Sequence, residues 1–438
     1  MAGVASECAN NEDKDRISAL ADGILTHILS LLPTKDAVMT SLLSRRWRSA
    51  WTCVTNVELD DSKVSNFEMF AERVMSVHDA RIKKFTLRCN DWHNSQLIHQ
   101  WISTAVMRNV AELDISLLTF EMINLPDCVY TCESLEVLKL AGWFALEVPD
   151  SKVVSLKRLK FLSFSWLQIK DDSYMTLLLS GCPVIEEIHI YKSMWEGLST
   201  FSVCSPSLQR LSVDIEGRQV ASKHCTFVLD VPNLKYLALL NDVMALSENY
   251  FEEQASSIVS ARLQVGNWVS PVPVIVKLLN HISSTINDLW ISYSTLEPIG
   301  RANDYAQLAA FNNLEYLKLE VESFAASHYW SVVHHLLQLS PNLKLLVLTA
   351  KGFASFAEWH QPDDVAECLL SNLVTLKVQG VDGEDRVMEL IEYYLRNAMV
   401  LNQMYISSRV LPEVGNDQIQ ERLSAFAWGS STCQLTIS

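Results

Sequence analysis

A short apolar pattern recurs along almost the whole chain at a nearly constant interval. The pattern is an apolar residue, two others, a second apolar residue, one other and a third apolar residue. Its fourteen copies are centred on Val57, Phe85, Leu113, Leu138, Leu162, Ile188, Leu211, Leu237, Leu263, Leu289, Leu317, Leu346, Leu376 and Met404. Neighbouring centres are 23 to 30 residues apart. Self-similarity at such a period is typical of solenoid repeats and constrains the fold more than any other feature.

Each copy predicts a short strand followed by a return segment. The last two apolar residues of a copy are two positions apart, so they lie on one face of a strand, and such short strands must stack on their neighbours to be stable. Apolar residues at helical spacing predict return helices over residues 67–77, 97–105, 275–282 and 387–395. The expected fold is α/β: a curved leucine-rich-repeat solenoid with its strands on the concave side and its helices on the convex side. The alternative is an ordinary two-layer α/β domain in which the spacing is coincidental.

The chain is acidic, with 51 Asp and Glu residues against 35 Lys and Arg and a formal net charge of −16. This excess disfavours a nucleic acid or an anionic membrane as the main ligand, because both would be repelled. Residues 1–15 contain no apolar segment typical of a secretory signal, and the apolar stretch at residues 24–32 is too short to cross a bilayer. We therefore expect a cytoplasmic and/or nuclear protein.

The ten cysteines are scattered singly, and the closest two are Cys128 and Cys132. Without a secretory signal, this distribution predicts reduced and mostly buried thiols. No Cys-x-x-Cys pair is present to begin a zinc site. We expect neither a metal nor another cofactor.

Residues 15–51 depart from the repeat and predict helices only. Two adjoining helical stripes are apolar, one formed by Leu20, Ile24, Ile28 and Leu31 and the other by Leu25, Leu29 and Leu32. Pro33 ends this helix, and Thr34 is placed to cap the next one, whose apolar side carries Val38, Leu42 and Leu43. Ser44 is placed to cap a third turn that carries Trp47 and Trp51.

These helices carry more apolar surface than a small module can bury by itself. Part of that surface serves as the cap that the first repeat of a solenoid needs. A pure cap, however, turns a polar outer face to water. The surplus therefore indicates that a partner protein covers the remainder.

Residues 15–37 (DRISALADGILTHILSLLPTKDA), followed by residues 41–51 (SLLSRRWRSAW), resemble an F-box. Residues 177–188 (LLLSGCPVIEEI) are similar to a repeat signature of plant F-box proteins with leucine-rich repeats, and residues 368–373 and 397–401 resemble the FBD segment of the same family. The family pattern has Pro where this chain has Ala21, and Glu where it has Gly23. The resemblance implies a flexible tail at residues 1–14, a three-helix F-box at 15–53, leucine-rich repeats at 54–360 and FBD-like terminal repeats at 361–438.

The resemblance also implies a function. F-box proteins of this kind bind a Skp-type adaptor and, through it, a cullin and RING scaffold, while the repeats hold a target protein for ubiquitination. The chain is then the substrate-recognition subunit of an SCF-type ubiquitin ligase and not itself an enzyme. The adaptor-binding residues carried over from the family are Leu20, Ile24, Leu25, Ile28, Leu32, Pro33, Val38 and Leu42. The sequence leaves open which of them face the adaptor and which face inward.

The target is expected to bind the concave strand face, where the residues between the inward-facing apolar positions point outward. They form a row of varied chemistry: Thr86, Asp114, Lys139, Ser163, His189, Ser212, Ala238, Gln264, Trp290, Lys318, Val347, Lys377 and Tyr405. Aromatic residues dominate protein-binding hot spots. Trp290, with Tyr236, Tyr316 and Lys318, is the expected anchor, although such aromatic residues are also commonly covered by their own neighbours.

Three alternatives compete with this function. Catalysis is disfavoured, because the dense polar pairs at residues 171–172, 334–335 and 363–364 have no partner at catalytic spacing, and no glycine loop for phosphate or nucleophile elbow occurs. A free-standing repeat scaffold or inhibitor without a role in ubiquitination differs from the ligase subunit only in the front module. An F-box that still docks beside a decayed target site is a third possibility.

Overall fold

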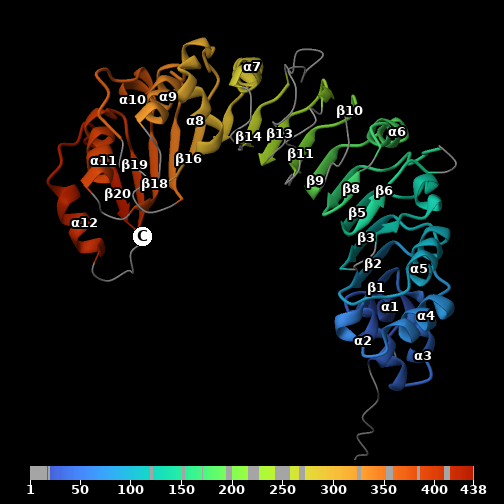
Figure 1. Ribbon diagram of the computed structural model, residues 1–438. Helices are drawn as coiled ribbons and strands as arrows, with labels where there is room; N and C mark the ends of the chain where they lie inside the picture. Colours follow the sequence, from blue (N-terminus) through green and yellow to red (C-terminus); the bar gives the residue numbers. More distant parts are fainter. Residues whose placement is uncertain are drawn as a thin grey trace, which may run out of the picture. The chain divides into compact units, whose positions relative to one another are not determined.

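The computed structural model describes residues 17, 20–118, 122–149, 153–169, 171–193, 200–215, 226–241, 257–265, 272–322, 327–351, 359–381, 385–408 and 415–437. The tail expected at residues 1–14 lies outside them. The chain divides into two compact units, Met1–Trp143 and Phe144–Ser438, which are considered separately below (Figure 1).

The first unit begins with short helices and continues as strands alternating with helices. Its elements are α1 (Asp22–Ser30), α2 (Thr34–Met39), η1 (Thr40–Leu42), α3 (Trp47–Ala50), η2 (Trp51–Cys53), β1 (Asn56–Asp60), η3 (Asp61–Lys63), α4 (Phe67–Val77), β2 (Lys84–Cys89), α5 (Ser95–Met107), β3 (Glu112–Leu117), β4 (Ile123–Asn124), η4 (Asp127–Thr131) and β5 (Val137–Gly142). β1, β2, β3 and β5 form a parallel sheet in that order. The predicted repeat centres Val57, Phe85, Leu113 and Leu138 lie opposite one another across it.

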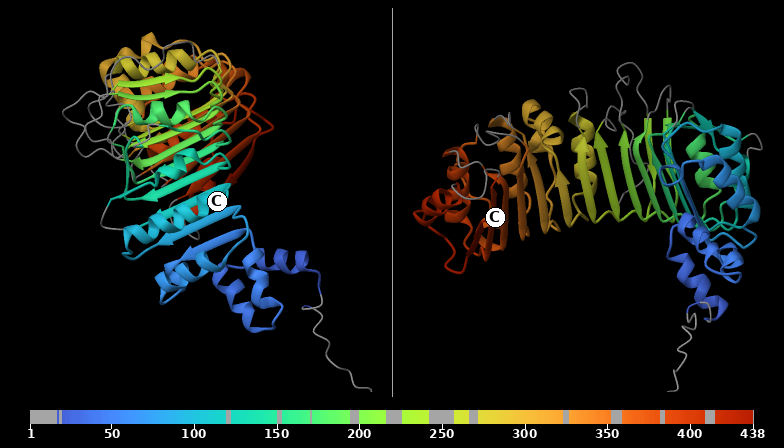
Figure 2. Two further views of the ribbon diagram at one scale, coloured as in Figure 1. Left: turned by 90° about the vertical axis from the view of Figure 1, so that its right-hand side faces the viewer. Right: turned by 90° about the horizontal axis from the view of Figure 1, so that it is seen from below.

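The second unit continues this pattern. Its elements are β6 (Phe144–Leu146), β7 (Phe161–Ser165), β8 (Gln168–Ile169), α6 (Tyr174–Ser180), β9 (Glu187–Ser193), β10 (Thr200–Cys204), β11 (Arg210–Ile215), β12 (Thr226–Asp230), β13 (Tyr236–Asn241), β14 (Ser260–Val265), α7 (Val272–Ile282), β15 (Asp288–Ile291), α8 (Tyr293–Ala302), η7 (Asp304–Gln307), β16 (Tyr316–Val321), α9 (Ser327–Gln338), β17 (Leu345–Ala350), α10 (Glu367–Ser371), β18 (Thr375–Val381), α11 (Asp385–Asn397), β19 (Gln403–Ser408), α12 (Gly415–Ser424) and β20 (Gln434–Ile437). Strands β7, β9, β11 and β13–β20 pair in parallel, in chain order, and run side by side from green to red in Figure 2.

The register confirms the repeat with one correction. Leu237 of β13 lies opposite Ala261 of β14, and Ala261 lies opposite Leu289 of β15. The copy predicted on Leu263 is therefore wrong by two residues, because Ala261 is small and the following Leu263 and Val265 imitate the pattern. β20 extends the sheet beyond the last predicted copy, with Leu435 opposite Met404.

Asparagine side chains before the strands tie successive repeats together. Each donates a hydrogen bond to a backbone carbonyl about one repeat earlier: Asn233 to Pro206 (2.8 Å), Asn313 to Ser284 (2.6 Å), Asn342 to Asn312 (2.8 Å) and Asn372 to Pro341 (3.0 Å). These bonds satisfy backbone groups at the turns, where the sheet ladder provides no partner. They hold the strands in the register that places the outward-facing side chains in rows.

The return segments are of two kinds. The four predicted helices are confirmed as α4, α5, α7 and α11, and α7 to α11 lie along one face of the strands of the second unit (Figure 1). Before β13, however, return segments contain short strands: β6 and β8 pair in parallel, and so do β10 and β12. In β10 the side chains of Phe201 and Val203 are buried while Cys204 is exposed, which is the two-residue alternation of a strand.

Candidate protein-binding surfaces

The N-terminal helices bury a core of their own. The buried apolar side chains of this region are Leu25, Leu29, Ala37, Trp47 and Trp51. Leu25 is 0% exposed. It therefore belongs to the core of the module: of the adaptor-binding candidates, whose orientation the sequence left open, Leu25 is one that faces inward.

Polar side chains in this region are used to hold the helices in place. Thr34 does not cap α2; its hydroxyl accepts a hydrogen bond from the backbone N–H of Glu58 in β1, at 2.7 Å. The Arg46 guanidinium donates twice to Asp22 Oδ1, at 3.1 and 2.6 Å. Ser44 makes no cap either, since Arg46 precedes the first residue of α3 and the Ser44 hydroxyl makes no hydrogen bond. These contacts join α1 to the start of α3, and α2 to the first strand.

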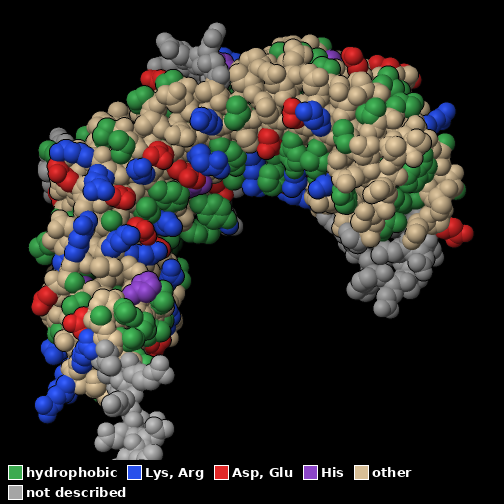
Figure 3. All heavy atoms as spheres, turned by 180° about the vertical axis from the view of Figure 1, so that it is seen from behind, with side chains coloured by type: hydrophobic (Ala, Val, Ile, Leu, Met, Phe, Trp, Pro, Cys, Tyr) green, Lys and Arg blue, Asp and Glu red, His purple; other side chains and the backbone are tan. Residues whose placement is uncertain are grey.

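These helices expose apolar side chains as well as charged ones. We define the F-box face as the exposed residues Ile24, Leu31, Leu32, Met39, Leu42 and Leu43. Leu42, Leu31 and Leu43 are 79%, 73% and 69% exposed, as much as residues that never enter a core. Apolar side chains reach the surface of the first unit near the point where the described chain begins (Figure 3).

The remaining adaptor-binding candidates from the sequence differ in how exposed their side chains are. Ile24, Leu32 and Leu42 lie in the F-box face, whereas Leu20, Ile28, Pro33 and Val38 are half-buried beside it. Leu31, Leu43 and Met39 were missing from the candidate set. Leu31 and Leu43 were both part of the apolar pattern in the sequence. When a helix is apolar along two stripes, however, the sequence does not show which stripe faces the core of the module. Gly23, where the F-box pattern has Glu, has no atom within 4 Å of the position of a Cβ, so no close contact requires the glycine.

In the outward row of the second unit, two cationic side chains stack on one tryptophan ring. Arg262, Trp290 and Lys318 lie opposite one another on β14, β15 and β16. The Arg262 guanidinium carbon is 3.6 Å and the Lys318 ammonium 3.9 Å from the centre of the Trp290 ring. Trp290 is therefore held between two cations, which is a favourable arrangement for an indole ring. The register puts Arg262 in the row where the sequence predicted Gln264.

The other two predicted target-binding residues lie in a parallel row. Tyr236 and Tyr316 share the row that passes through the first residue of each strand, with β14 and β15 between them. Tyr236 packs against Arg210, whose guanidinium carbon is 4.4 Å from the ring centre. Burial raises the pKa of Tyr316, and the nearby Asp288 raises it further. The structure thus joins Trp290 to Lys318 but keeps Tyr236 apart from them.

A hollow of about 520 Å³ on the helical side of the second unit brings together two of the polar pairs weighed for catalysis. His334 Nε2 lies 2.8 Å from Asp364 Oδ1, and the Gln338 amide donates to Asp364 Oδ2 at 2.5 Å. The hydrogen bond with His334 holds the pKa of Asp364 below its ordinary value. These contacts fasten α9 to the segment before α10, which is a structural role.

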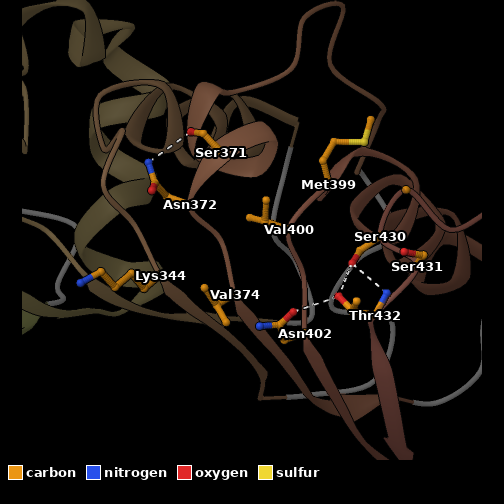
Figure 4. A pocket seen from close by; sticks show the side chains of 11 residues that line it. Lys344, Ser371, Asn372, Val374, Met399, Val400, Asn402, Ser430, Ser431 and Thr432 are labelled. Carbon is orange, nitrogen blue, oxygen red and sulfur yellow. Dashed lines mark hydrogen bonds between the residues drawn. The ribbon is translucent and has the colours of Figure 1, made fainter.

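A second hollow, of about 510 Å³, lies at the starts of the last strands (Figure 4). Thr432 donates to Asn402 Oδ1 at 3.0 Å, and its hydroxyl lies 3.1 Å from that of Ser430. Asn372 donates to the hydroxyl of Ser371 at 3.1 Å (Figure 4). Because these polar groups bond to one another, the hollow is a gap between successive repeats rather than a site prepared for a ligand.

The described cysteines are all free thiols. Burial raises the pKa of Cys89, Cys182 and Cys368 to about 12, so these thiols are unreactive at neutral pH. Within the described ranges, no three His, Cys, Asp or Glu side chains gather as they would around a metal ion. None of the described helices has the length and apolar character to span a bilayer.

Comparison with known proteins identifies the class first. Residues 17–56 match the F-box domain, residues 98–265 match the leucine-rich repeats of FBD-associated F-box protein At5g56370, and residues 361–406 match the FBD. Among the relatives, FBD-associated F-box protein At1g66310 of Arabidopsis thaliana is 30% identical, over 98% of this chain and 97% of its own length. F-box/FBD/LRR-repeat protein At3g52680 and F-box/LRR-repeat protein 13, from the same plant, are each 31% identical, over 96% and 90% of this chain and 93% and 90% of their own lengths.

The chain therefore belongs to the family of plant F-box/FBD/LRR-repeat proteins. The F-box at the N-terminus, the repeats and the FBD follow in the order expected from the sequence. Proteins of this class generally act as adaptors without catalysing a reaction themselves, and the F-box is the part that connects them with ubiquitin ligases.

Proposed function

We propose that this protein is the substrate-recognition subunit of an SCF-type ubiquitin ligase. The observation that carries the proposal is the F-box face, which exposes six apolar side chains. Burying one such side chain contributes about 1.5–3 kcal/mol, so several together are enough for a stable complex. The occupant is a Skp-type adaptor, which links the chain to a cullin and RING scaffold.

The adaptor contacts are assigned to the F-box face, with Leu20, Ile28, Pro33 and Val38 at its border. The target protein binds the strand face, which we propose to be the concave side of a curved solenoid, with the stacked Trp290 and Lys318 as its anchor and Tyr316 beside them. Tyr236, which lies in the parallel row on β13, extends the contact with the target. The ligase subunit acts in the cytoplasm, the nucleus or both.

Reconstitution tests the proposal. The purified full-length chain is mixed with a plant Skp-type adaptor and then with a cullin–RING pair, and the mixture is separated by size-exclusion chromatography. We expect the chain to elute with the adaptor and to bring the cullin with it. A chain that elutes alone, while a known F-box protein binds the same adaptor preparation, would leave the alternative of a repeat scaffold without a role in ubiquitination.

Deletion of residues 1–51 is a poor version of this test. The deletion removes Thr34, which accepts the hydrogen bond from Glu58. It also removes Trp51, a buried side chain of the first unit. The first strand would lose its cover, so a loss of binding would not separate docking from folding. Substitutions at exposed positions of the F-box face avoid this difficulty, because they leave the buried core in place.

A further inference from the structure

The outward row on strands β14–β19 alternates regularly between cations and apolar side chains. In order across the sheet, the register places Arg262, Trp290, Lys318, Val347, Lys377 and Tyr405 opposite one another. A cation therefore stands on every second strand, and an aromatic or aliphatic residue on each strand between. Lys377 also lies over the ring of the neighbouring Tyr405, with its ammonium 5.1 Å from the ring centre.

The cations of this row lack carboxylate partners. Among the described residues, no carboxylate lies within ion-pair distance of Arg262, Lys318 or Lys377, although the chain as a whole carries a net charge of −16. Other cations of the same unit are paired: Lys344 with Glu315 at 2.7 Å and Lys160 with Glu186 at 3.2 Å. The row is thus a positive strip in an acidic protein.

Acidic groups also face the row from neighbouring positions, and Glu320 and Asp288 are two of them. Glu320 is buried and is engaged by Lys351, whose ammonium lies 2.5 Å from its carboxylate. Asp288 lies in the adjacent row, opposite Tyr316. Burial lowers the pKa of Lys318, and the nearby Arg262 and Lys351 lower it further against the opposing effect of Glu320. Burial is the main cause of this shift, so the ammonium of Lys318 is partly removed from water.

The spacing of the row restricts the geometry of that anion. Neighbouring strands lie about 4.8 Å apart, so the backbone positions that carry the cations on alternate strands repeat every ~9.6 Å. The charged groups of Arg262 and Lys318 lie closer together than this, because both are over the Trp290 ring. A polyproline-II segment has three residues per turn and a rise of about 3.1 Å per residue, so side chains at every third position point to one side every ~9.3 Å. Such a segment, running across the strands, matches the repeat of these backbone positions.

We propose that this strip binds an extended acidic segment of the target protein, with a carboxylate at every third residue opposite Arg262, Lys318 and Lys377. The residues between pack on Tyr405 and on the edge of Trp290, the ring of which is covered by Arg262 and Lys318, whereas Val347 is buried. The inference rests on the proposed function in that it makes this segment part of the ligase target.

Fluorescence anisotropy with labelled peptides tests the spacing. The probe is three Glu-Pro-Ala repeats, and the matched control peptide has the same composition with its three glutamates adjacent. We expect the full-length chain to bind the spaced peptide at least about tenfold more tightly, because only the spaced peptide engages all three cations together. Equal affinity for both peptides, or tighter binding of a single-stranded RNA of equal charge, would overturn the inference.

Charge reversal tests the residues. The double variant Lys318→Glu/Lys377→Glu should weaken binding of the spaced peptide by about tenfold or more, since two attractive contacts become repulsive. The matched control is Lys160→Glu/Lys344→Glu, which makes the same change in net charge at exposed positions outside the row and should bind the peptide as the parent chain does. If both double variants bind alike, the row is not the site.

Adaptor co-elution is measured on the same samples, so the two proposals fail separately. A chain that elutes with the Skp-type adaptor but binds neither peptide overturns the acidic-segment inference alone. A chain that binds the spaced peptide but elutes without the adaptor overturns the ligase assignment alone.

Discussion

The F-box face and the strand row of the second unit present opposite chemistry. The F-box face is made of aliphatic side chains, and some polar groups of its helices bond to one another, as Arg46 does to Asp22. The strand row exposes cations that stack on aromatic rings, as Arg262 and Lys318 do on Trp290. An aliphatic face suits a single constant partner, because apolar burial gives affinity without demanding particular charges. Charged groups at fixed spacing suit a choice among targets, because wrong partners are repelled.

The largest expected effect is on the F-box face. Replacing Leu32 and Leu42 together by Asp should weaken adaptor binding at least about 100-fold, because each buried leucine contributes about 1.5–3 kcal/mol and each carboxylate must also be desolvated. Isothermal titration calorimetry with the purified adaptor measures the change. Met107→Asp is the control, because Met107 is exposed at the end of α5 and lies outside the F-box face. If the double variant binds within about threefold of the parent chain, the partner covers other residues.

A second prediction separates the face from its core within one helix. Leu25→Ala should lower the free energy of unfolding of the N-terminal helices by about 2–5 kcal/mol, as for other fully buried leucines. The neighbouring Ile24→Ala removes a 50% exposed side chain and should cost less than about 0.5 kcal/mol in the free protein. Hydrogen exchange of residues 22–53, followed by mass spectrometry, reports both. Equal protection in the two variants would mean that Leu25 is not a core residue.

The contrast between Leu25 and Ile24 also shows what the sequence could not decide. Both residues lie on apolar stripes of α1, and a stripe pattern finds the helix without showing which stripe is inside. That choice is made by residues distant along the chain, chiefly Trp47 and Trp51, which are buried in the same module. The predicted helix cap at Thr34 was wrong for a related reason. Thr34 has the chemistry and the position of a cap, but its hydroxyl accepts a hydrogen bond from the backbone N–H of Glu58 in β1.

The repeats were far more predictable than the F-box helices. A strand with one face buried cannot slip by one residue without turning its apolar set to water, so spacing alone fixed nearly every pairing. The exception is β14, which carries the small Ala261 at the central position. Because the predicted copy was centred on Leu263 instead, Gln264 was placed in the outward row where the structure has Arg262. The return strands β10 and β12 were missed because a repeat period does not state whether the return is helical or extended.

The two surfaces should also respond differently to salt. Raising ionic strength from about 0.05 to 0.5 M should weaken binding of the spaced acidic peptide by roughly tenfold, because screening shortens the reach of exposed charges. Adaptor binding should change by less than about threefold, since apolar burial is not screened. Titrations of both ligands at each salt concentration give the comparison. Similar salt dependence for the two would show that the aliphatic and cationic surfaces do not have separate roles.

The smallest expected effect concerns the charge of Lys318. Burial, together with Arg262 and Lys351, holds its pKa below the ordinary value of 10.5, so its ammonium loses the proton at a lower pH than an exposed lysine does. The charged form is complete well below this lowered pKa and is lost as the pH rises through it, so the affinity for the acidic peptide should fall in the same range. The decline should be about two- to fivefold, the size of one partly exposed ion pair. Lys318→Arg should abolish this decline, because a guanidinium stays protonated throughout. A decline that persists in Lys318→Arg would mean that another group titrates, and that Lys318 is not the central contact of the row.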